Sequence, residues 1–298
     1  MRRGLRLCGL AALAVVASGC AVSNLHGPGG SSVYRVGEKE TLVDVAQRHN
    51  VGYVELVAAN PGVDPWLPKP GTEVFIPKVH LPPKTGAKGE RIVINLAEMR
   101  LYYYEPDGKP PHSYAIGIGR EGLGTPLGVT TILKKVKDPS WRPTARMRKE
   151  DPALPAVVPP GPDNPMGSRA LYLALRPYAI HGTNKQFAVG RRVSSGCIRM
   201  YKKDIEELYE RVRPGTKVLI VDQPVKLGWI NDQLYIEAHP TQKQSDELTF
   251  GKPVHATMTD AIAADVRAAA GPHSKRLDWT VVKKAAAERR GYPVRITR

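Results

Sequence analysis

The spacing of hydrophobic and polar positions changes along the chain and divides it into four parts. Residues 7–17 form an apolar run, and residues 33–77 combine two short alternating stretches with two helical ones. Residues 91–222 consist mainly of short apolar stretches of strand length, and a helical period returns in residues 241–298. Because a period of two indicates strands and a period near 3.6 indicates helices, these changes predict separate structural units.

Residues 33–77 predict a small βααβ unit. A strand is expected around residues 34–36, a first helix capped by Thr41, a second helix before Asn60-Pro61, and a strand over residues 73–76. The unit resembles a LysM module at Tyr34, Val36, Thr41, Leu42, Ala46, Leu56, Asn60, Gly71, Ile76 and Pro77. That resemblance implies binding to the N-acetylglucosamine backbone of peptidoglycan. A spacer without sugar binding is the alternative.

Residues 91–222 predict a mainly β domain. Strands are expected at 91–95, 100–104, 113–119, 129–133, 170–175, 178–181 and 218–221. One amphipathic helix is expected over residues 203–213, before Pro214-Gly215. Without a regular alternation of strands and helices, a Rossmann-like sheet is disfavoured. The proline-rich stretch from 138 to 167 is too long for a passive connection, which indicates a lid or a disordered segment.

The last part, residues 241–298, predicts a basic, partly helical tail. Helices are expected over 260–270 and 280–290, each ended by glycine. The second is rich in Lys and Arg, which indicates a solvated helix face or a contact with an anionic surface. The whole chain carries 44 basic and 28 acidic side chains, a net charge of +16. This charge predicts an acidic partner without identifying it.

The N-terminus has the pattern of an export signal. Arginines precede the apolar run, which ends in small residues before Cys20. The run is too short for a transmembrane helix, which needs about 20 apolar residues, and residues 1–20 predict a secretory signal peptide. The segment resembles a bacterial lipobox, which implies lipidation of Cys20 and a periplasmic protein anchored to the outer membrane. Signal cleavage without a lipid is the alternative.

Export makes the three cysteines informative. Cys8 leaves with the signal and Cys20 is the expected lipid anchor, so Cys197 remains without an internal partner. An unpaired thiol in an oxidising compartment indicates intermolecular pairing or a reactive nucleophile, and a buried inert cysteine is the plain alternative. Export also argues against a nucleic-acid partner, since an exported chain seldom meets cytoplasmic DNA and no recognition motif is present.

The residues around Cys197 favour a nucleophile. His181 ends an apolar strand sixteen positions earlier, which is ample for a strand, a loop and a return. A nearby base converts a thiol into a nucleophile. Gly196 permits close approach of the backbone, and the N–H groups of Gly196 and Cys197 are candidates to stabilise an oxyanion. The fork-shaped guanidinium of Arg199 matches a substrate carboxylate.

Two short segments together resemble the signature of the YkuD-type L,D-transpeptidases. They are His181-Gly182-Thr183 and Ser194-Ser195-Gly196-Cys197-Ile198-Arg199. Further matches are 93–102, 114–119, 125–127, 143–144, 154–159 and 161–167. The resemblance implies a YkuD-type β-sandwich catalytic domain. With the LysM-like unit in front, it extends to the ErfK/YbiS/YcfS/YnhG branch. Many members carry His where this chain has Ser195.

The resemblance also implies a mechanism. Cys197, deprotonated with help from His181, attacks a diaminopimelate carbonyl of a peptidoglycan tetrapeptide stem and forms a thioester. An amine then accepts the acyl group, either a lysine of a major outer-membrane lipoprotein or the diaminopimelate of a second stem. Arg199, Ser195, Gly196 and Gly182 are the expected substrate-binding residues. No cofactor is implied, and one His with one Cys is too few ligands for a structural zinc site. A catalytically silent wall-binding tether and an L,D-carboxypeptidase that uses water are the alternatives.

Overall fold

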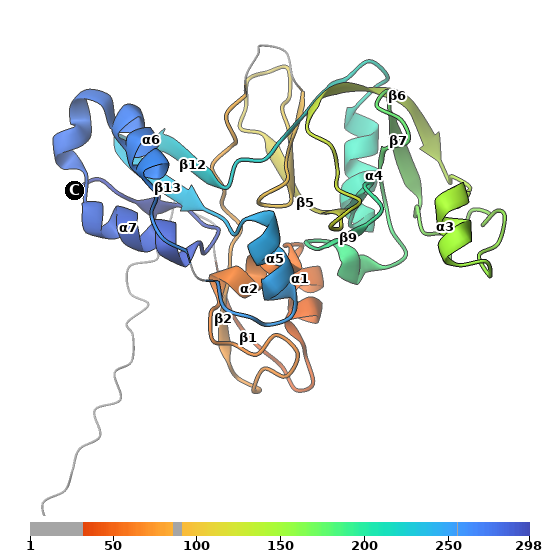
Figure 1. Ribbon diagram of the computed structural model, residues 1–298, viewed down its shortest axis with the longest axis horizontal. Coiled ribbons are helices and arrows are strands. Elements are labelled where there is room, and N and C mark those ends of the chain that lie inside the picture. The colour runs from red at the N-terminus through yellow and green to blue at the C-terminus, as the bar shows by residue number, and fades with distance from the viewer. Residues whose placement is uncertain (1–31, 86–90, 255) are drawn as a thin grey trace, which may run out of the picture.

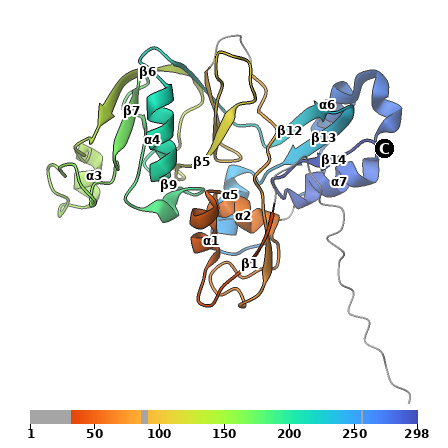
Figure 2. The ribbon, with the colours of Figure 1, turned by 180° about the vertical axis from the view of Figure 1, so that it is seen from behind.

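The computed structural model describes residues 32–85, 91–254 and 256–298, so the predicted signal 1–20 and Cys20 lie outside the described residues. Figure 1 shows three units: the N-terminal one below, the large sheet in the centre and to the right, and the C-terminal one to the left. Figure 2 shows the N-terminal unit between the other two from behind. None of the helices in the described ranges has the length and apolar character that crossing a membrane requires.

The N-terminal unit contains the four elements in the expected order. They are β1 (Ser32–Arg35), α1 (Leu42–His49), α2 (Tyr53–Ala59) and β2 (Glu73–Ile76). β1 and β2 pair antiparallel. Thr41 caps α1 as predicted: its hydroxyl accepts from the N–H of Asp44, whose carboxylate accepts from the N–H of Thr41. Both helices bury their apolar faces, including Leu42 and Leu56, in a core that also contains Val74 and Ile76 of β2.

Nine strands form one large sheet in the order β10-β8-β7-β6-β11-β3-β4-β5-β9. Their bounds are β3 (Ile92–Asn95), β4 (Arg100–Tyr103), β5 (His112–Gly119), β6 (Gly128–Lys137), β7 (Arg169–Leu173), β8 (Ala179–His181), β9 (Arg192–Ser194), β10 (Ile198–Met200) and β11 (Lys217–Val221). Because β10 also pairs with β5, the sheet folds back on itself. Ile94, Ile116 and Ile132 are fully buried in its core. The mainly β fold and the β3–β4 hairpin are confirmed.

The proline-rich stretch of the large unit is held by its own hydrogen bonds. It contains α3 (Ala145–Glu150). Trp141 and Val158 exchange backbone hydrogen bonds of 2.9 and 2.8 Å. The fully buried side chain of Asn164 donates to the carbonyl of Pro139 at 2.8 Å and accepts from the N–H of Met166 at 2.8 Å. These hydrogen bonds satisfy backbone groups that are not paired within a sheet. They hold the segment in a defined conformation, although its sequence has no strong hydrophobic period.

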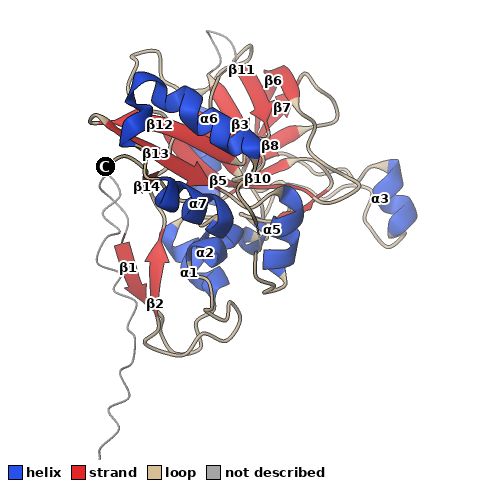
Figure 3. Cartoon of the chain, turned by 60° about the vertical axis from the view of Figure 1, so that its left-hand side comes forward, coloured by secondary structure: helices blue, strands red, loops and turns tan. Residues whose placement is uncertain are grey.

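The C-terminal part is a folded unit rather than a tail. Its elements are β12 (Val225–Ile230), β13 (Gln233–Ala238), α5 (Gln242–Thr249), α6 (Asp260–Ala270), the 3-10 helix η2 (Gly271–Arg276), α7 (Trp279–Glu288) and β14 (Val294–Arg295). The strands form a three-stranded sheet with α6 and α7 beside it (Figure 3). Leu234, Ile236, Val266 and Val282 are fully buried in a core of their own.

This unit corrects the predicted boundary. The sequence pattern locates α6 and α7, but it places a tail from residue 241, whereas the unit begins at Val225. The β12–β13 hairpin was missed. Asn231 and Asp232 join its strands with φ values of 47° and 59°. Two consecutive positive φ values are typical of a type I′ turn, and an Asn-Asp pair between apolar stretches is the signal that identifies it.

Buried charged side chains join the three units. Glu55 of α2 accepts a hydrogen bond of 2.9 Å from Arg100 of β4, and its other oxygen lies 2.8 Å from Nε2 of His80. Nδ1 of His80 lies 3.0 Å from Glu237 of β13. Burial and the charge of Arg100 oppose protonation of His80, but the two carboxylates outweigh them and raise its pKa. Since carboxylates only accept hydrogen bonds, the imidazolium is the form that fits between them.

A buried lysine completes this network. Lys226 Nζ lies 2.5 Å from Glu98 and 2.9 Å from Glu237. Ligand atoms of His80, Glu98, Glu237 and His239 all lie within 4.8 Å of one another, and these are residue types that bind metal ions. The ammonium group already supplies positive charge between the two carboxylates. We therefore interpret the cluster as an ion-pair network and not as a metal site.

Candidate active site

The pairing of two strands brings the predicted catalytic residues together. β8 and β10 are parallel, with Ile198 opposite Ile180 and Arg199 opposite His181. Side chains alternate between the faces of a sheet, and paired positions share a face. His181 and Arg199 therefore lie on one face, and Cys197, two positions before Arg199, is directed to the same face from the end of the preceding loop. The Cys197 Sγ lies 4.0 Å from the carbonyl of Pro177, just before β8.

His181 is held as a neutral imidazole. Its side chain is buried, and Nδ1 donates to the carbonyl of Gly182 at 2.6 Å, which leaves Nε2 as the acceptor nitrogen. Burial, and after it the charge of Arg199, lower the pKa of His181 from 6.5 to about 4. A neutral imidazole with an unprotonated Nε2 is the form that a general base requires.

Cys197 is held as a thiol. Burial raises its pKa, while the backbone N–H of Ala179 and the charge of Arg199 act in the opposite direction without reversing the shift. The directions for Cys197 and His181 agree: both groups are uncharged at neutral pH. These directions favour a thiol beside a neutral imidazole over a preformed thiolate–imidazolium pair.

Two hydroxyl groups fix the loop before the cysteine. Ser194 Oγ accepts from the N–H of Gly196 at 3.0 Å and donates to the carbonyl of Cys197 at 2.6 Å. Thr125 Oγ1 donates to the carbonyl of Gly196 at 2.8 Å and accepts from the N–H of Gly119 at 3.1 Å. The Gly196 N–H is thereby used inside the loop, which corrects its expected role toward an oxyanion. The Cys197 amide remains as the candidate donor.

The conformation of Gly196 explains why the loop needs glycine. Its φ is 104°, a value that side chains disfavour. A Cβ at this position would lie 2.5 Å from Cε1 of Tyr178. Trp141, Tyr172 and Cys197 all pack against one small buried cluster. The structure thus gathers Trp141, Tyr172 and Tyr178 near the loop that carries the cysteine.

The other predicted substrate-binding residues differ in position. Arg199 is half-buried, and within the described ranges it forms no ion pair and its Nε has no hydrogen-bond partner. Ser195 is half-buried, with its hydroxyl 3.5 Å from Nη1 of Arg120. Gly182 lines a cavity of about 450 Å³ together with Thr183. Of these predicted substrate-binding residues, Arg199 therefore offers a positive charge to a ligand. Gly182 has a second role, because its carbonyl accepts the hydrogen bond from His181.

Sequence reasoning missed the roles of Ser194 and Thr125. Both are buried hydroxyl residues: Ser194 ends β9 two positions before Gly196, and Thr125 follows Gly124 in the loop after β5. A serine or threonine near glycine is a weak signal, because such residues form turns throughout proteins. Only the fold brings Thr125, from the loop after β5, to the carbonyl of Gly196 seventy-one positions later.

Comparison with known proteins identifies the family. Residues 89–220 match YkuD, the L,D-transpeptidase catalytic domain. The chain is 39% identical over 314 residues to the probable L,D-transpeptidase ErfK/SrfK of Escherichia coli (strain K12), covering 100% of this chain and 98% of that protein. It is 42% identical over 266 residues to the probable L,D-transpeptidase YbiS of the same strain, and this match covers 87% of this chain and 84% of that protein.

Solved structures give weaker similarity. The Ldtfm–avibactam carbamoyl enzyme is 24% identical with a TM-score of 0.38, and the match covers 46% of this chain and 50% of that one. The probable L,D-transpeptidases ErfK/SrfK and YbiS, by contrast, match over 98% and 84% of their own length. On the strength of these matches, this chain belongs to the YkuD family of L,D-transpeptidases, to which its relatives ErfK/SrfK, YbiS and YcfS are assigned by name, and is an acyl-transferring enzyme.

Proposed function

We propose that this enzyme acts on peptidoglycan tetrapeptide stems through a thioester on Cys197, with His181 as general base. The observation that carries the proposal is the pairing of β8 with β10, which sets Arg199 opposite His181 in register and brings the loop that ends at Cys197 to the same strand pair. The acyl donor is the carbonyl of the L-centre of diaminopimelate. The half-buried guanidinium of Arg199 binds a carboxylate of the stem, because it is a cation near Cys197 that forms no ion pair with any of the described residues and whose Nε has no hydrogen-bond partner among them.

The first half-reaction transfers the acyl group to sulfur. His181 Nε2 takes the thiol proton as Cys197 Sγ forms a bond to the carbonyl carbon, and the amide N–H of Cys197 stabilises the oxyanion. When this intermediate collapses, the carbon–nitrogen bond to the terminal D-Ala breaks. The imidazolium of His181 gives its proton to the leaving amine, so that free D-Ala and a neutral imidazole remain.

The second half-reaction releases the product. An incoming amine attacks the thioester carbonyl and gives its proton to His181, and the carbon–sulfur bond breaks. The leaving sulfur then takes the proton back from the imidazolium, which regenerates the thiol. The proposed acceptor is a lysine of a major outer-membrane lipoprotein, and the diaminopimelate amine of a second stem is the runner-up. We further propose a periplasmic location with a lipid on Cys20.

The mass of the intact protein tests this function. Incubation of the mature enzyme with a free tetrapeptide stem is expected to add the mass of the stem minus D-Ala, and hydroxylamine should remove it, since hydroxylamine cleaves thioesters. The Cys197→Ala variant should fold normally and gain no mass. Acylation of that variant at the wild-type rate would disprove the role of Cys197. Product analysis with lipoprotein, with a second stem and with neither then separates lysine, diaminopimelate and water as acceptors.

A further inference from the structure

Positively charged side chains gather on a segment that has no role in the proposed mechanism. Residues 134–149 contain seven basic side chains and one acidic side chain, so they contribute +6 to the net charge of +16. The segment runs from β6 into α3. Figures 1 and 3 show α3 projecting from the large unit on the side away from the C-terminal unit. No residue of α3 is buried, so its charges are accessible to a ligand.

The strand register sets the first of these cations on the face of the sheet that carries the catalytic residues. Lys134 of β6 pairs with Tyr172 of β7, and Tyr172 pairs with Ala179 of β8. Ala179 lies two positions before His181 on the same strand. Because paired positions and alternate positions share a face, Lys134 lies on the face of His181. Its ammonium group is 4.9 Å from the centroid of the Tyr172 ring.

An ion pair connects α3 to the loop of the nucleophile. Glu150, the last residue of α3, pairs with Arg120 at 3.7 Å, and Nη1 of Arg120 lies 3.5 Å from the hydroxyl of Ser195. Ser195 precedes Cys197 by two positions. On the other side of α3, Trp141 packs against the same small buried cluster as Cys197. The chain before and after α3 is therefore attached near the nucleophile.

Six exposed or half-exposed cations border this region, and we call them the cationic rim. They are Arg120, Lys134, Arg142, Arg146, Arg148 and Lys149. Three carboxylates, those of Glu121, Glu150 and Asp151, directly follow rim residues in the sequence, which leaves an excess of three positive charges. Glu150 is already shared by Arg120 and Arg146. Among the described residues the other cations of the rim form no ion pair, and unpaired surface cations attract anionic groups.

We propose that the cationic rim selects the acyl acceptor by binding a carboxylate close to the attacking amine. Guanidinium groups match a carboxylate in charge and in geometry. The rim lies on a projecting segment, where a second peptide can reach it while the donor is attached to Cys197 and bound by Arg199. Diaminopimelate carries a carboxylate on the carbon atom of its attacking amine, and a lysine carries a carboxylate only at the end of a chain. This inference rests on the proposed thioester mechanism.

Acceptors that differ only in one carboxylate test the proposal. The thioester is first formed on the mature protein with a tetrapeptide stem, and the remaining stem is removed. Mass spectrometry then follows transfer to a short peptide that ends in a free lysine and to the same peptide with a C-terminal amide. At low salt the wild type should transfer about fivefold faster to the free acid, which is the size expected for an exposed ion pair. A second stem and its carboxamide form the other pair of acceptors, and comparison of the two pairs identifies the preferred source of the carboxylate.

Two double variants locate the preference on the molecule. Arg142→Gln/Lys149→Gln removes two unpaired cations of the rim and should transfer to the free acid and to the amide at nearly the same rate. Lys275→Gln/Lys284→Gln is the matched control, because it removes two exposed lysines from the C-terminal unit and changes the net charge by the same amount. The control should keep the wild-type preference. Salt at about 0.5 M should abolish this preference in the wild type, since it screens exposed charges.

Three results would overturn the proposal while the proposed function stands. The first is equal transfer by the wild type to both members of each acceptor pair. The second is a preference that survives in Arg142→Gln/Lys149→Gln or that the control also loses. The third is a rim variant that slows acylation by the donor stem as strongly as it slows transfer, because the rim would then serve the donor. Absence of a thioester on the wild type would instead reject the proposed function, and this inference with it.

Discussion

We expect His181 to stay neutral down to about pH 4, and lowering the pH is the perturbation that tests this. The side chain is buried, and Arg199, its register partner on β10, adds a positive charge nearby. Both effects disfavour the imidazolium and lower the pKa of His181 from 6.5 to about 4. In the unfolded chain the same histidine titrates near its ordinary value.

The magnitude follows from proton linkage. Between pH 6.5 and pH 4 the unfolded chain binds the proton at this position and the folded chain does not, so stability falls as the pH falls through this window. At about 1.4 kcal/mol for each pH unit, the full contribution of His181 is about 3 kcal/mol, present above pH 6.5 and lost below pH 4. His80 has a raised pKa, so its contribution has the opposite sign and is lost as the pH rises.

Two measurements check this. An NMR titration of the histidine ring signals, with the His181→Gln variant identifying the His181 signal, should give a midpoint near pH 4. The free energy of unfolding in urea should depend less steeply on pH between 6.5 and 4 in His181→Gln than in the wild type, since glutamine does not titrate. A His181 midpoint of 6 or above, or identical slopes in the two proteins, would refute the reasoning.

Three further substitutions test the network and the nucleophile loop. Lys226→Met should lower the free energy of unfolding by about 3–5 kcal/mol in urea denaturation, because it leaves buried carboxylates without their ammonium partner. Thr125→Val, similar in shape, should lose about 1–3 kcal/mol of stability and also lower kcat, and Thr125→Ser should restore kcat; equal kcat in all three proteins would contradict its positioning role. Gly196→Ala should slow acylation about a hundredfold, because the new methyl group meets Tyr178 and displaces the sulfur; stem kinetics followed by mass spectrometry measure it, and a wild-type rate would show that the loop tolerates the methyl group.

The sequence by itself determined the elements with a regular period and the residues of the signature. Thr41 capped the predicted helix, the β3–β4 hairpin formed as expected, and α6 has the predicted bounds. These features depend on neighbours within a few positions, so local pattern suffices for them. Cys197 and His181 were singled out because the residues around them resemble the YkuD signature, which is a local sequence pattern.

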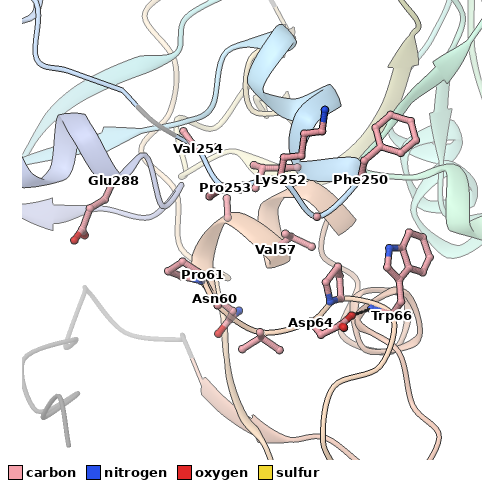
Figure 4. Close-up of a pocket in the computed structure, with 16 residues that line it drawn as sticks. Val57, Asn60, Pro61, Asp64, Trp66, Phe250, Lys252, Pro253, Val254 and Glu288 are labelled. Carbon is pink, nitrogen blue, oxygen red and sulfur yellow. Dashed lines mark hydrogen bonds between the residues drawn. The ribbon is translucent and has the colours of Figure 1, made fainter. Parts of the chain in front are cut away.

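Features that depend on residues distant in the sequence emerge only in the folded structure. The C-terminal sheet needs β14 from the far end of the unit, and its core is shared with two helices. The charge states of His181 and Cys197 follow from burial and from Arg199, which the strand register brings near them. The cavity of about 550 Å³ between the end of α2 and the segment after α5 likewise requires two segments about 190 positions apart (Figure 4). Burial and charge act through space, so these properties appear only when the chain has folded.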